Sequence, residues 1–303
     1  ADKVFFTNSG TEAIECAIKM ARKYHHVKGN PHRIEIITFE GSFHGRSIAA
    51  ISAAVAHKLT SGFGPMLPGF RQVPLGNVAA LRECLSSNTA AILIEPIQGE
   101  GGINVPSIDY IKTLRKLCDR EEILLIFDEV QCGIGRTGKL FACENSGIEP
   151  DIMAIAKGIG GGFPLGACLS QTESAMGMTL GTHGSTYGGN PLACAVGIAV
   201  LKEVLSSDFL TNVDRLSIQL IEGLQHLVSS YPSVFHSVRG VGLMIGLKCQ
   251  IDINKVIVEA YNERLLIVAA ADNVVRLLPP LNISETEITT AIQKLEAVAQ
   301  KLE

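Results

Sequence analysis

Hydrophobic residues occur along the first two thirds of the chain as short uninterrupted runs separated by helical patterns. The runs that predict strands are Val4–Phe6, Ile34–Phe39, Ala90–Ile94, Ile123–Phe127 and Ile152–Ala156. The helical patterns extend from about Thr11 to Val27, Ile108 to Arg120 and Pro191 to Leu205. Runs that are apolar at successive positions suit strands buried on both faces of a parallel sheet. Their alternation with helices predicts an α/β fold, in which helices sandwich a mostly parallel sheet.

The pattern changes near residue 207. Amphipathic or helical patterns follow at Val213–Leu227, Asn254–Arg264 and Glu285–Leu302, the last opened by Ser284, and strand-like runs at Val241–Leu247 and Val274–Leu278. This mixture of helical and strand-like patterns predicts a smaller α+β domain at the C-terminal end. We therefore expect residues 1–206 to form a large domain and residues 207–303 to form a small one.

Composition narrows the class of protein. The chain has 303 residues, of which 47% are hydrophobic and 18% are charged, and this excludes an intrinsically disordered chain. Its 26 basic and 30 acidic residues give no general attraction to nucleic acid or to anionic membranes. No apolar run approaches the roughly 20 residues that span a bilayer. The eight cysteines are scattered singly, which favours reduced thiols in a core.

The start of the chain also carries information. It begins at Ala1 without Met and enters the run Val4–Phe6 almost at once. We therefore expect a further N-terminal segment to precede it, and the absence of a visible targeting peptide excludes little.

Candidate chemistry lies where the predicted strands end, because ligands of open parallel sheets bind beyond the carboxyl ends of the strands. The first run ends in Thr7-Asn8-Ser9-Gly10-Thr11-Glu12-Ala13, at the start of a helix. A glycine at this junction lets free N–H groups approach an anion, and the helix dipole helps to hold it. The spacing of Ser9 and Glu12 also fits an ordinary helix cap, which is the favoured interpretation of this motif alone.

Two further strand ends carry an acid and an amine. The run Ile123–Phe127 ends in Asp128, whose burial requires a cation or donor. The run Ile152–Ala156 ends in Lys157, which is followed by a glycine-rich stretch. A lysine at such a place is commonly solvated. A buried acid near an isolated amine nevertheless matches the requirements of pyridoxal phosphate (PLP): the lysine forms a Schiff base, and the acid keeps the ring nitrogen protonated.

Six motifs occur in order along the chain. They are Asn8-Ser9-Gly10-Thr11-Glu12-Ala13, Phe43-His44-Gly45-Arg46, Glu95-Pro96-Ile97-Gln98-Gly99-Glu100-Gly101-Gly102, Asp128-Glu129-Val130-Gln131, Ala156-Lys157-Gly158 and Gly184-Ser185-Thr186-Tyr187-Gly188-Gly189-Asn190-Pro191. Together they resemble the class III (ornithine-type) aminotransferases of PLP fold type I, and the similarity extends through the whole chain. The resemblance implies that fold and PLP as the cofactor. Segments 127–133, 135–142, 181–186 and 276–281 are most similar to members that act on N-acetylornithine.

The resemblance also implies roles for individual residues. Lys157 corresponds to the Schiff-base lysine and proton shuttle, and Asp128 to the partner of the ring nitrogen. The other cofactor-binding residues that it implies are Gly10 and Thr11 at the phosphate, Phe43 and Val130 on the ring faces, Gln131 at the ring hydroxyl, His44, and Thr186, which in the family reaches the phosphate of the neighbouring subunit. The substrate-binding residues that it implies are Arg46 and Arg276 for carboxylates, Glu100, which covers Arg276 in one half-reaction, and Ser185. No metal is expected, and the role of Glu95 stays open.

The implied reaction moves the δ-amino group of N-acetylornithine to 2-oxoglutarate, giving N-acetylglutamate semialdehyde and glutamate for arginine biosynthesis. The resemblance implies a homodimer with shared active sites, in a bacterial cytoplasm or an organelle matrix, with no nucleic-acid or membrane partner. Two alternatives stay open. One is another ω-aminotransferase that uses ornithine, succinylornithine, succinyldiaminopimelate or 4-aminobutyrate, and the other is an inactive PLP-binding fragment.

One glycine-rich segment suggests nucleotide chemistry instead. Gly133, Gly135 and Gly138 match the dinucleotide fingerprint, but they do not lie at the strand end and no long helix is predicted behind them. The same segment nearly matches a P-loop, yet Leu140 stands where a magnesium-binding Ser or Thr is needed. The histidines have no metal-ligand spacing. These patterns therefore disfavour an oxidoreductase, an ATPase and a metalloenzyme.

Overall fold

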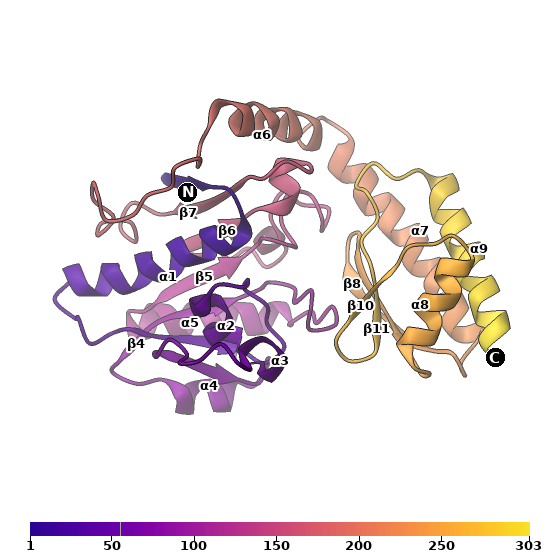
Figure 1. The fold of residues 1–303 in the computed structure, drawn as a ribbon, viewed down its shortest axis with the longest axis horizontal. Helices are drawn as coiled ribbons and strands as arrows, with labels where there is room; N and C mark the ends of the chain where they lie inside the picture. Colours follow the sequence, from indigo (N-terminus) through magenta and orange to yellow (C-terminus); the bar gives the residue numbers. More distant parts are fainter. Residues whose placement is uncertain (55) are drawn as a thin grey trace.

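The computed structural model describes residues 1–54 and 56–303, and its larger part is built on a seven-stranded sheet (Figure 1). In the order β1-β7-β6-β5-β4-β2-β3, the strands are Lys3–Thr7, Gly166–Ser170, Ile152–Ile155, Leu124–Asp128, Thr89–Ile94, Glu35–Phe39 and Phe70–Val73. The neighbours from β6 to β3 are parallel, whereas β7 is antiparallel to both β6 and β1. All strands except β7 therefore run in one direction and end at one edge, which confirms the predicted mostly parallel sheet.

Helices cover both faces of this sheet. They are α1 (Gly10–Val27), α2 (Ile48–Ala54), α3 (His57–Thr60), α4 (Val78–Cys84), α5 (Ile108–Glu121) and α6 (Pro191–Val204). Strand β4 shows the two-sided burial: Ala91 and Leu93 lie in the core under α1, and Ile92 and Ile94 lie in the core under α5. None of the helices formed by the described residues is long and apolar enough to cross a membrane.

The C-terminal part forms a second, antiparallel sheet in the order β10-β11-β9-β8. Its strands are Val268–Ala270, Val274–Leu277, Met244–Cys249 and Phe235–Val241, and its helices are α7 (Phe209–Ser230), α8 (Ile253–Asn262) and α9 (Glu285–Leu302). The helices pack together on the side away from the large sheet, and the small sheet lies between them and the large part (Figure 1). The predicted smaller α+β unit is therefore present. The boundary at residues 206 and 207 falls between α6 and α7 and stays a prediction.

Several elements differ from the sequence-based expectation. Strand β1 is an edge strand, so Val4 and Phe6 are exposed rather than buried on both faces. The run Val241–Leu247 is not one strand but the turn and flanks of the β8–β9 hairpin. Strands β3, β7 and β10, most of β8, and the short helices α2, α3 and α4 were not predicted. The eight cysteines are free and seven of them are buried, as expected for core thiols.

Candidate active site

A cavity of about 350 Å³ opens at the carboxyl ends of β1, β5 and β6. Eight of the residues that the resemblance assigns to the cofactor line it: Gly10, Thr11, Phe43, His44, Asp128, Val130, Gln131 and Lys157. Sequence reasoning did not assign the other lining residues, which are Asn8, Ser9, Gly45, Glu95, Ala156, Gly162, Phe163, Pro164 and Leu165. The loop from Gly162 to Leu165 follows Lys157 closely, so the glycine-rich sequence was the only signal for it.

Asp128 is the last residue of β5, and its buried carboxylate lies in a network of hydrogen bonds. His44 Nδ1 donates to Asp128 Oδ2 at 2.8 Å, and the backbone N–H of Val130 donates to Oδ1 at 3.0 Å. Burial is the largest single influence and disfavours the charged imidazole, but the hydrogen bond to Asp128 and the charges of Asp128 and Glu95 together outweigh it and raise the pKa of His44. His44 Nε2 is buried without a hydrogen-bond partner in the described part of the chain. The pair therefore presents a fixed acid at the cavity wall.

Glu95 is a second buried acid at the cavity. Its Oε1 accepts a hydrogen bond from Phe43 N at 2.8 Å, and its Oε2 accepts one from Gly99 N at 3.2 Å. Burial, together with the charge of Asp128, raises the pKa of Glu95 to about 7. Glu95 thus joins the segment of Phe43 to the loop that carries Glu100, a role that its sequence neighbourhood did not reveal.

Lys157 follows β6 directly and has an unusual backbone conformation. Its φ is +47°, in the left-handed region, which costs a non-glycine residue about 1–3 kcal/mol. The residue is exposed at the cavity, and β6 pairs with β5 through Ala154 and Asp128. The amine and the acid therefore extend from neighbouring parallel strands into the same space.

The junction of β1 and α1 forms another wall of the cavity. The Ser9 hydroxyl accepts a hydrogen bond from Glu12 N, so Ser9 caps α1, while the Glu12 carboxylate accepts hydrogen bonds from Asn8 rather than from the Ser9 backbone. A Cβ at Gly10 would lie 2.7 Å from Val130 Cγ1, so a side chain there has no room. The cap and the anion-binding arrangement coexist, because the first N–H groups of a helix have no partners within it.

These residues fit pyridoxal phosphate. The N-terminus of α1 is suited to a phosphate, the buried Asp128 to a protonated ring nitrogen, and the Lys157 amine to an aldehyde. The close packing of Gly10 against Val130, which leaves no room for a side chain, and the fixed position of Asp128 are the observations that carry this match.

The substrate-binding candidates lie around this cavity rather than in its lining. Arg276 on β11 is buried, and its Nη1 donates to Glu100 Oε1 at 2.5 Å and to Gln131 Oε1 at 3.0 Å. Its Nε is buried without a partner among the described residues. Arg46 is exposed, and its guanidinium carbon lies 5.6 Å from the centre of the Phe43 ring.

The segment with Ser185 and Thr186 lies beside the start of α1. Asn8 Nδ2 donates to Ser185 Oγ at 3.2 Å, which ties this segment to the β1–α1 junction. Thr186 is exposed and does not line the cavity of its own chain. Thr186 was predicted to reach the phosphate of the neighbouring subunit, and that contact stays a prediction.

The glycines of the disfavoured nucleotide motif serve packing. Segment 133–138 forms turns and is followed by a four-residue 3-10 helix, η1 (Ala142–Asn145), instead of a long helix. A Cβ at Gly138 would clash with the Asp214 carboxylate. Residues 1–54 and 56–303 contain no group of three or more His, Cys, Asp or Glu side chains arranged to hold a metal ion.

Comparison with known proteins places this geometry in a family. The model of the family described as aminotransferase class-III matches residues 1–299. The acetylornithine aminotransferase of Mesorhizobium japonicum is 56% identical over 302 residues, which cover 100% of this chain and 76% of that protein.

Solved structures agree with this match. The ornithine aminotransferase of Toxoplasma gondii has a TM-score of 0.95 at 34% identity, over 99% of this chain and 73% of that chain. An amine transaminase from an uncultivated Pseudomonas species, solved in its PLP-bound form, has a TM-score of 0.92 at 32% identity, over 99% of this chain and 77% of that chain. Both identities are high enough to support a shared family as well as a shared fold.

Proposed function

Because the chain belongs to the class III aminotransferases, we propose that it transfers the δ-amino group of N-acetylornithine to 2-oxoglutarate. The products are N-acetylglutamate semialdehyde and glutamate, and PLP is the cofactor. The observation that carries the reaction type is the meeting of Asp128 and Lys157 in one cavity beside the N-terminus of α1. The donor is argued from the relative at 56% identity, an acetylornithine aminotransferase, against 34% for the ornithine aminotransferase.

Most contacts to the cofactor would be made by residues of one chain. Lys157 provides the amine for covalent attachment, Asp128 holds the proton of the ring nitrogen, and His44 holds Asp128 in place. The remaining contacts are assigned to Gly10 and Thr11 at the phosphate, to Phe43 and Val130 on the ring faces, and to Gln131 at the ring hydroxyl. The bound cofactor supplies an electron sink for the carbon that loses a proton. Once the incoming substrate amine has taken its place on the cofactor, the freed Lys157 Nζ would be the base that removes this proton.

Arginines recognise the carboxylates of both substrates. The planar guanidinium groups of Arg46 and Arg276 suit bidentate binding of a carboxylate. Glu100 occupies Arg276 while the amino donor is bound and releases it for 2-oxoglutarate and glutamate. The existing contact of Arg276 with Glu100 supports this exchange, because the arginine already has an anionic partner to give up. Ser185 completes the substrate side from the segment beside Asn8.

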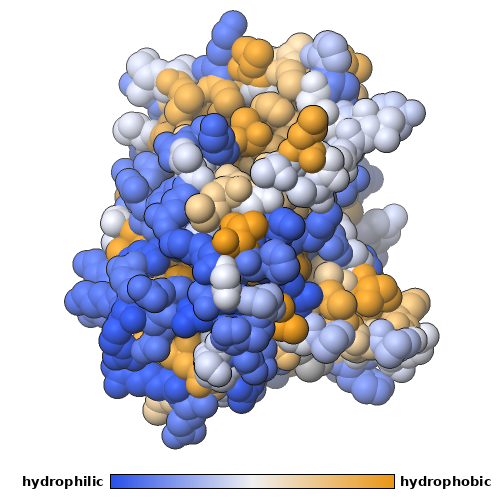
Figure 2. Space-filling model, turned by 90° about the vertical axis from the view of Figure 1, so that its left-hand side faces the viewer, coloured by the Kyte–Doolittle hydropathy of each residue, from blue (hydrophilic) through white to orange (hydrophobic). Residues whose placement is uncertain are grey.

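The active enzyme is a homodimer in this proposal. Helix α6 buries only Ala193, Gly197 and Val204, although almost all its residues are apolar. Hydrophobic side chains gather over the upper part of the face in Figure 2, at the height of α6 and β1 in Figure 1. An exposed apolar area of this kind marks an interaction site. A partner seated there brings its own Thr186 to the phosphate. The same proposal places the reaction in arginine biosynthesis in the cytoplasm.

Half-reactions test the proposed donor. Purified holoenzyme is mixed with N-acetylornithine, ornithine, succinylornithine, succinyldiaminopimelate or 4-aminobutyrate, and the change in the visible absorbance of the cofactor is followed. We expect N-acetylornithine to react with the highest kcat/KM. A preference for any other donor would contradict the substrate assignment while leaving the aminotransferase chemistry intact.

Lys157→Ala tests the chemistry itself. We expect turnover to fall below detection, because no other amine of the cavity lining can form the covalent bond. Mass spectrometry after borohydride reduction measures that bond directly, and it should disappear in the variant. Lys139→Ala removes an exposed lysine outside the cavity and should retain both signals. A covalent cofactor that persists in Lys157→Ala would refute the assignment.

A further inference from the structure

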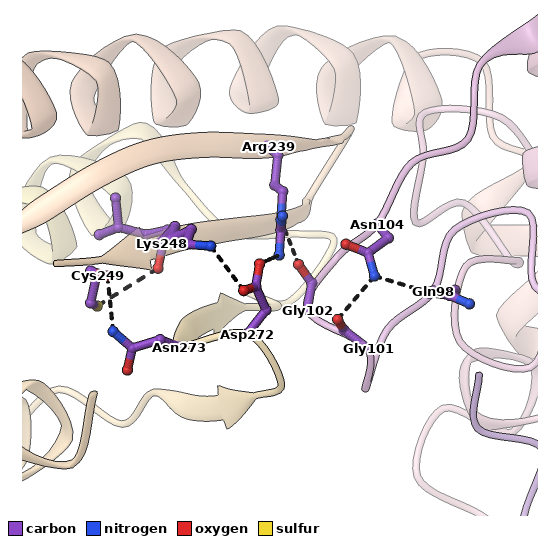
Figure 3. Close-up of polar contacts among 10 residues, drawn as sticks. Gln98, Gly101, Gly102, Asn104, Arg239, Lys248, Cys249, Asp272 and Asn273 are labelled. Atoms are coloured by element: carbon purple, nitrogen blue, oxygen red, sulfur yellow. Dashed lines mark hydrogen bonds and ion pairs between the residues drawn. The ribbon is translucent and has the colours of Figure 1, made fainter. Parts of the chain in front are cut away.

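The loop that carries Glu100 is a compact turn that follows β4 of the large sheet. Gln98 and Asn104 close it through two backbone hydrogen bonds of 3.0 and 3.1 Å. The Asn104 side chain also donates to Gln98 Oε1 at 2.9 Å and to the carbonyl of Gly101 at 3.0 Å (Figure 3). The backbone on either side of Glu100 is therefore fixed within the loop.

The same loop is also tied to the small sheet. Arg239 Nε on β8 donates to the carbonyl of Gly102 at 2.6 Å, and the N–H of Ala271 donates to the carbonyl of Glu100 at 2.9 Å. A Cβ at Gly102 would lie 2.7 Å from the Ala271 oxygen and 2.8 Å from Arg239 Nη2. The loop backbone thus packs directly on Arg239 and the β10–β11 turn.

Arg239 is itself held by an acid. Its Nη2 donates to Asp272 Oδ2 at 3.0 Å, and Lys248 Nζ donates to Asp272 Oδ1 at 2.8 Å. Figure 3 shows both cations directed at this one carboxylate. Asp272 lies in the β10–β11 turn, and β11 carries Arg276, which binds Glu100. One short segment therefore holds both the loop of Glu100 and the partner of its side chain.

We propose that Arg239 and Asp272 are positioning residues, which hold Glu100 against Arg276 and so set how strongly Glu100 competes with a substrate carboxylate. This inference rests on the proposed function, in which Arg276 binds the carboxylate of 2-oxoglutarate and glutamate. A tethered carboxylate competes at a high effective concentration, which falls when the tether is loosened. Loosening the Arg239–Asp272 contact therefore strengthens dicarboxylate binding, and it does so only while Glu100 is present.

Titration of glutarate into the holoenzyme, followed by calorimetry, tests this inference. Glutarate has two carboxylates but neither an amino nor a keto group, so it binds without turnover. We expect Arg239→Met and Asp272→Asn each to tighten glutarate binding about threefold, because partly exposed ion pairs contribute modestly. The side chains of Arg239 and Asp272 are 29% and 47% exposed.

The pair of variants separates positioning from simple charge. Arg239→Met removes a positive charge and Asp272→Asn removes a negative one, so an effect of charge alone would move the two affinities in opposite directions. In a Glu100→Gln background, which itself should bind glutarate more tightly, neither substitution should add anything. Arg215→Met serves as a matched control, because it removes an exposed pair with Glu285 on the helices of the same small unit.

Unchanged affinities, shifts of opposite sign, weaker binding in both variants, or tightening that persists in Glu100→Gln would each overturn the inference. Asp272→Asn keeps the side-chain volume, so the test stands even where Arg239→Met fails to fold. If the half-reactions show a donor other than N-acetylornithine, this titration remains valid, because glutarate binding involves Arg276 and Glu100 and requires no N-acetylornithine.

Discussion

Asp128 and Glu129 are adjacent at the end of β5, but their carboxyl groups have different environments. Asp128 lines the cavity, whereas the next carboxyl group is fully buried and accepts hydrogen bonds from Ala142 N at 2.8 Å and Cys143 N at 2.7 Å. Burial raises the pKa of Glu129 to about 7 from its ordinary 4.5. Glu129 therefore holds the start of η1, whose residues do not line the cavity.

This raised pKa predicts a pH-dependent cost to stability. Between about pH 4.5 and pH 7 the native state retains a proton on Glu129 that the unfolded state has lost, so the free energy of unfolding falls as pH rises. A shift of this size corresponds to about 3 kcal/mol. Glu129→Gln should remove the pH-dependent contribution of this residue to the free energy of unfolding. Relative to the wild type, the variant should therefore gain about that much stability between pH 5 and pH 8 in urea denaturation.

A constant offset between the two proteins is expected as well, because the new amide faces a backbone donor that the carboxylate used to satisfy. Only the change of this stability difference with pH therefore reports the protonation of Glu129. Glu149→Gln, at an exposed site, should leave both the offset and the slope near zero. A stability difference between Glu129→Gln and the wild type that does not vary with pH would show that Glu129 is ionised in the native protein throughout this range.

The site residues differ in how visible they are in the sequence. Asp128 and Lys157 could be paired in advance, because neighbouring parallel strands end at the same edge of a sheet. The contact of Gln131 with Arg276 could not, since it joins residues 145 positions apart across the two sheets. The position of Arg46 over the Phe43 ring depends equally on side-chain packing, which no local pattern encodes.

At the scale of elements, the β8–β9 hairpin explains a wrong prediction. The run from Val241 to Leu247 is apolar almost throughout, and it predicted one strand. The chain turns instead at Gly242 and Leu243, between the paired residues Val241 and Met244. Leu243 is buried although it lies in a turn, because the turn packs on the loop around Arg136. Hydrophobic patterning cannot reveal a turn that is itself buried.

Gly242 should therefore be intolerant of a side chain for two separable reasons. Its φ is +59°, and a Cβ would lie 2.6 Å from both the Arg136 oxygen and Thr137 Cα. Gly242→Ala should cost about 3 kcal/mol, of which the backbone conformation accounts for about 1 kcal/mol and the clash for the rest. Chemical denaturation of the variant measures this loss.

Gly29→Ala is the matched control for Gly242→Ala. Gly29 has a φ of +82°, and a Cβ there would meet nothing within 4 Å. The control should therefore show the conformational cost alone, about 1 kcal/mol. Equal losses of stability in the two variants would mean that the turn moves away from Arg136 in Gly242→Ala. The close contact between the two units would then add little to the cost of that substitution.

At the scale of the whole molecule, the small sheet shares a small hydrophobic core with the large part. Met244 from the small sheet packs with Ile97, Ile103 and Cys132 from loops of the large part and with Ala142 at the start of η1. The division into two units could be predicted from the change in patterning, but this contact could not, because its members come from loops of no regular period. The shared core holds the loop of Glu100 and the strand of Arg276 in one arrangement, which the proposed exchange of carboxylates requires.

The apolar face of α6 leads to the last prediction, which concerns assembly. Ile198 lies on this face and is 55% exposed, whereas Ile218 on α7 is 57% exposed in the other unit. Ile198→Asp should turn the proposed dimer into a monomer in sedimentation velocity, because a buried unpaired charge is costly at an interface. It should also weaken retention of PLP, since Thr186 would no longer reach the partner's phosphate. Ile218→Asp introduces the same charge at equal exposure and should leave both properties intact. A dimer that survives Ile198→Asp would contradict the assigned interface.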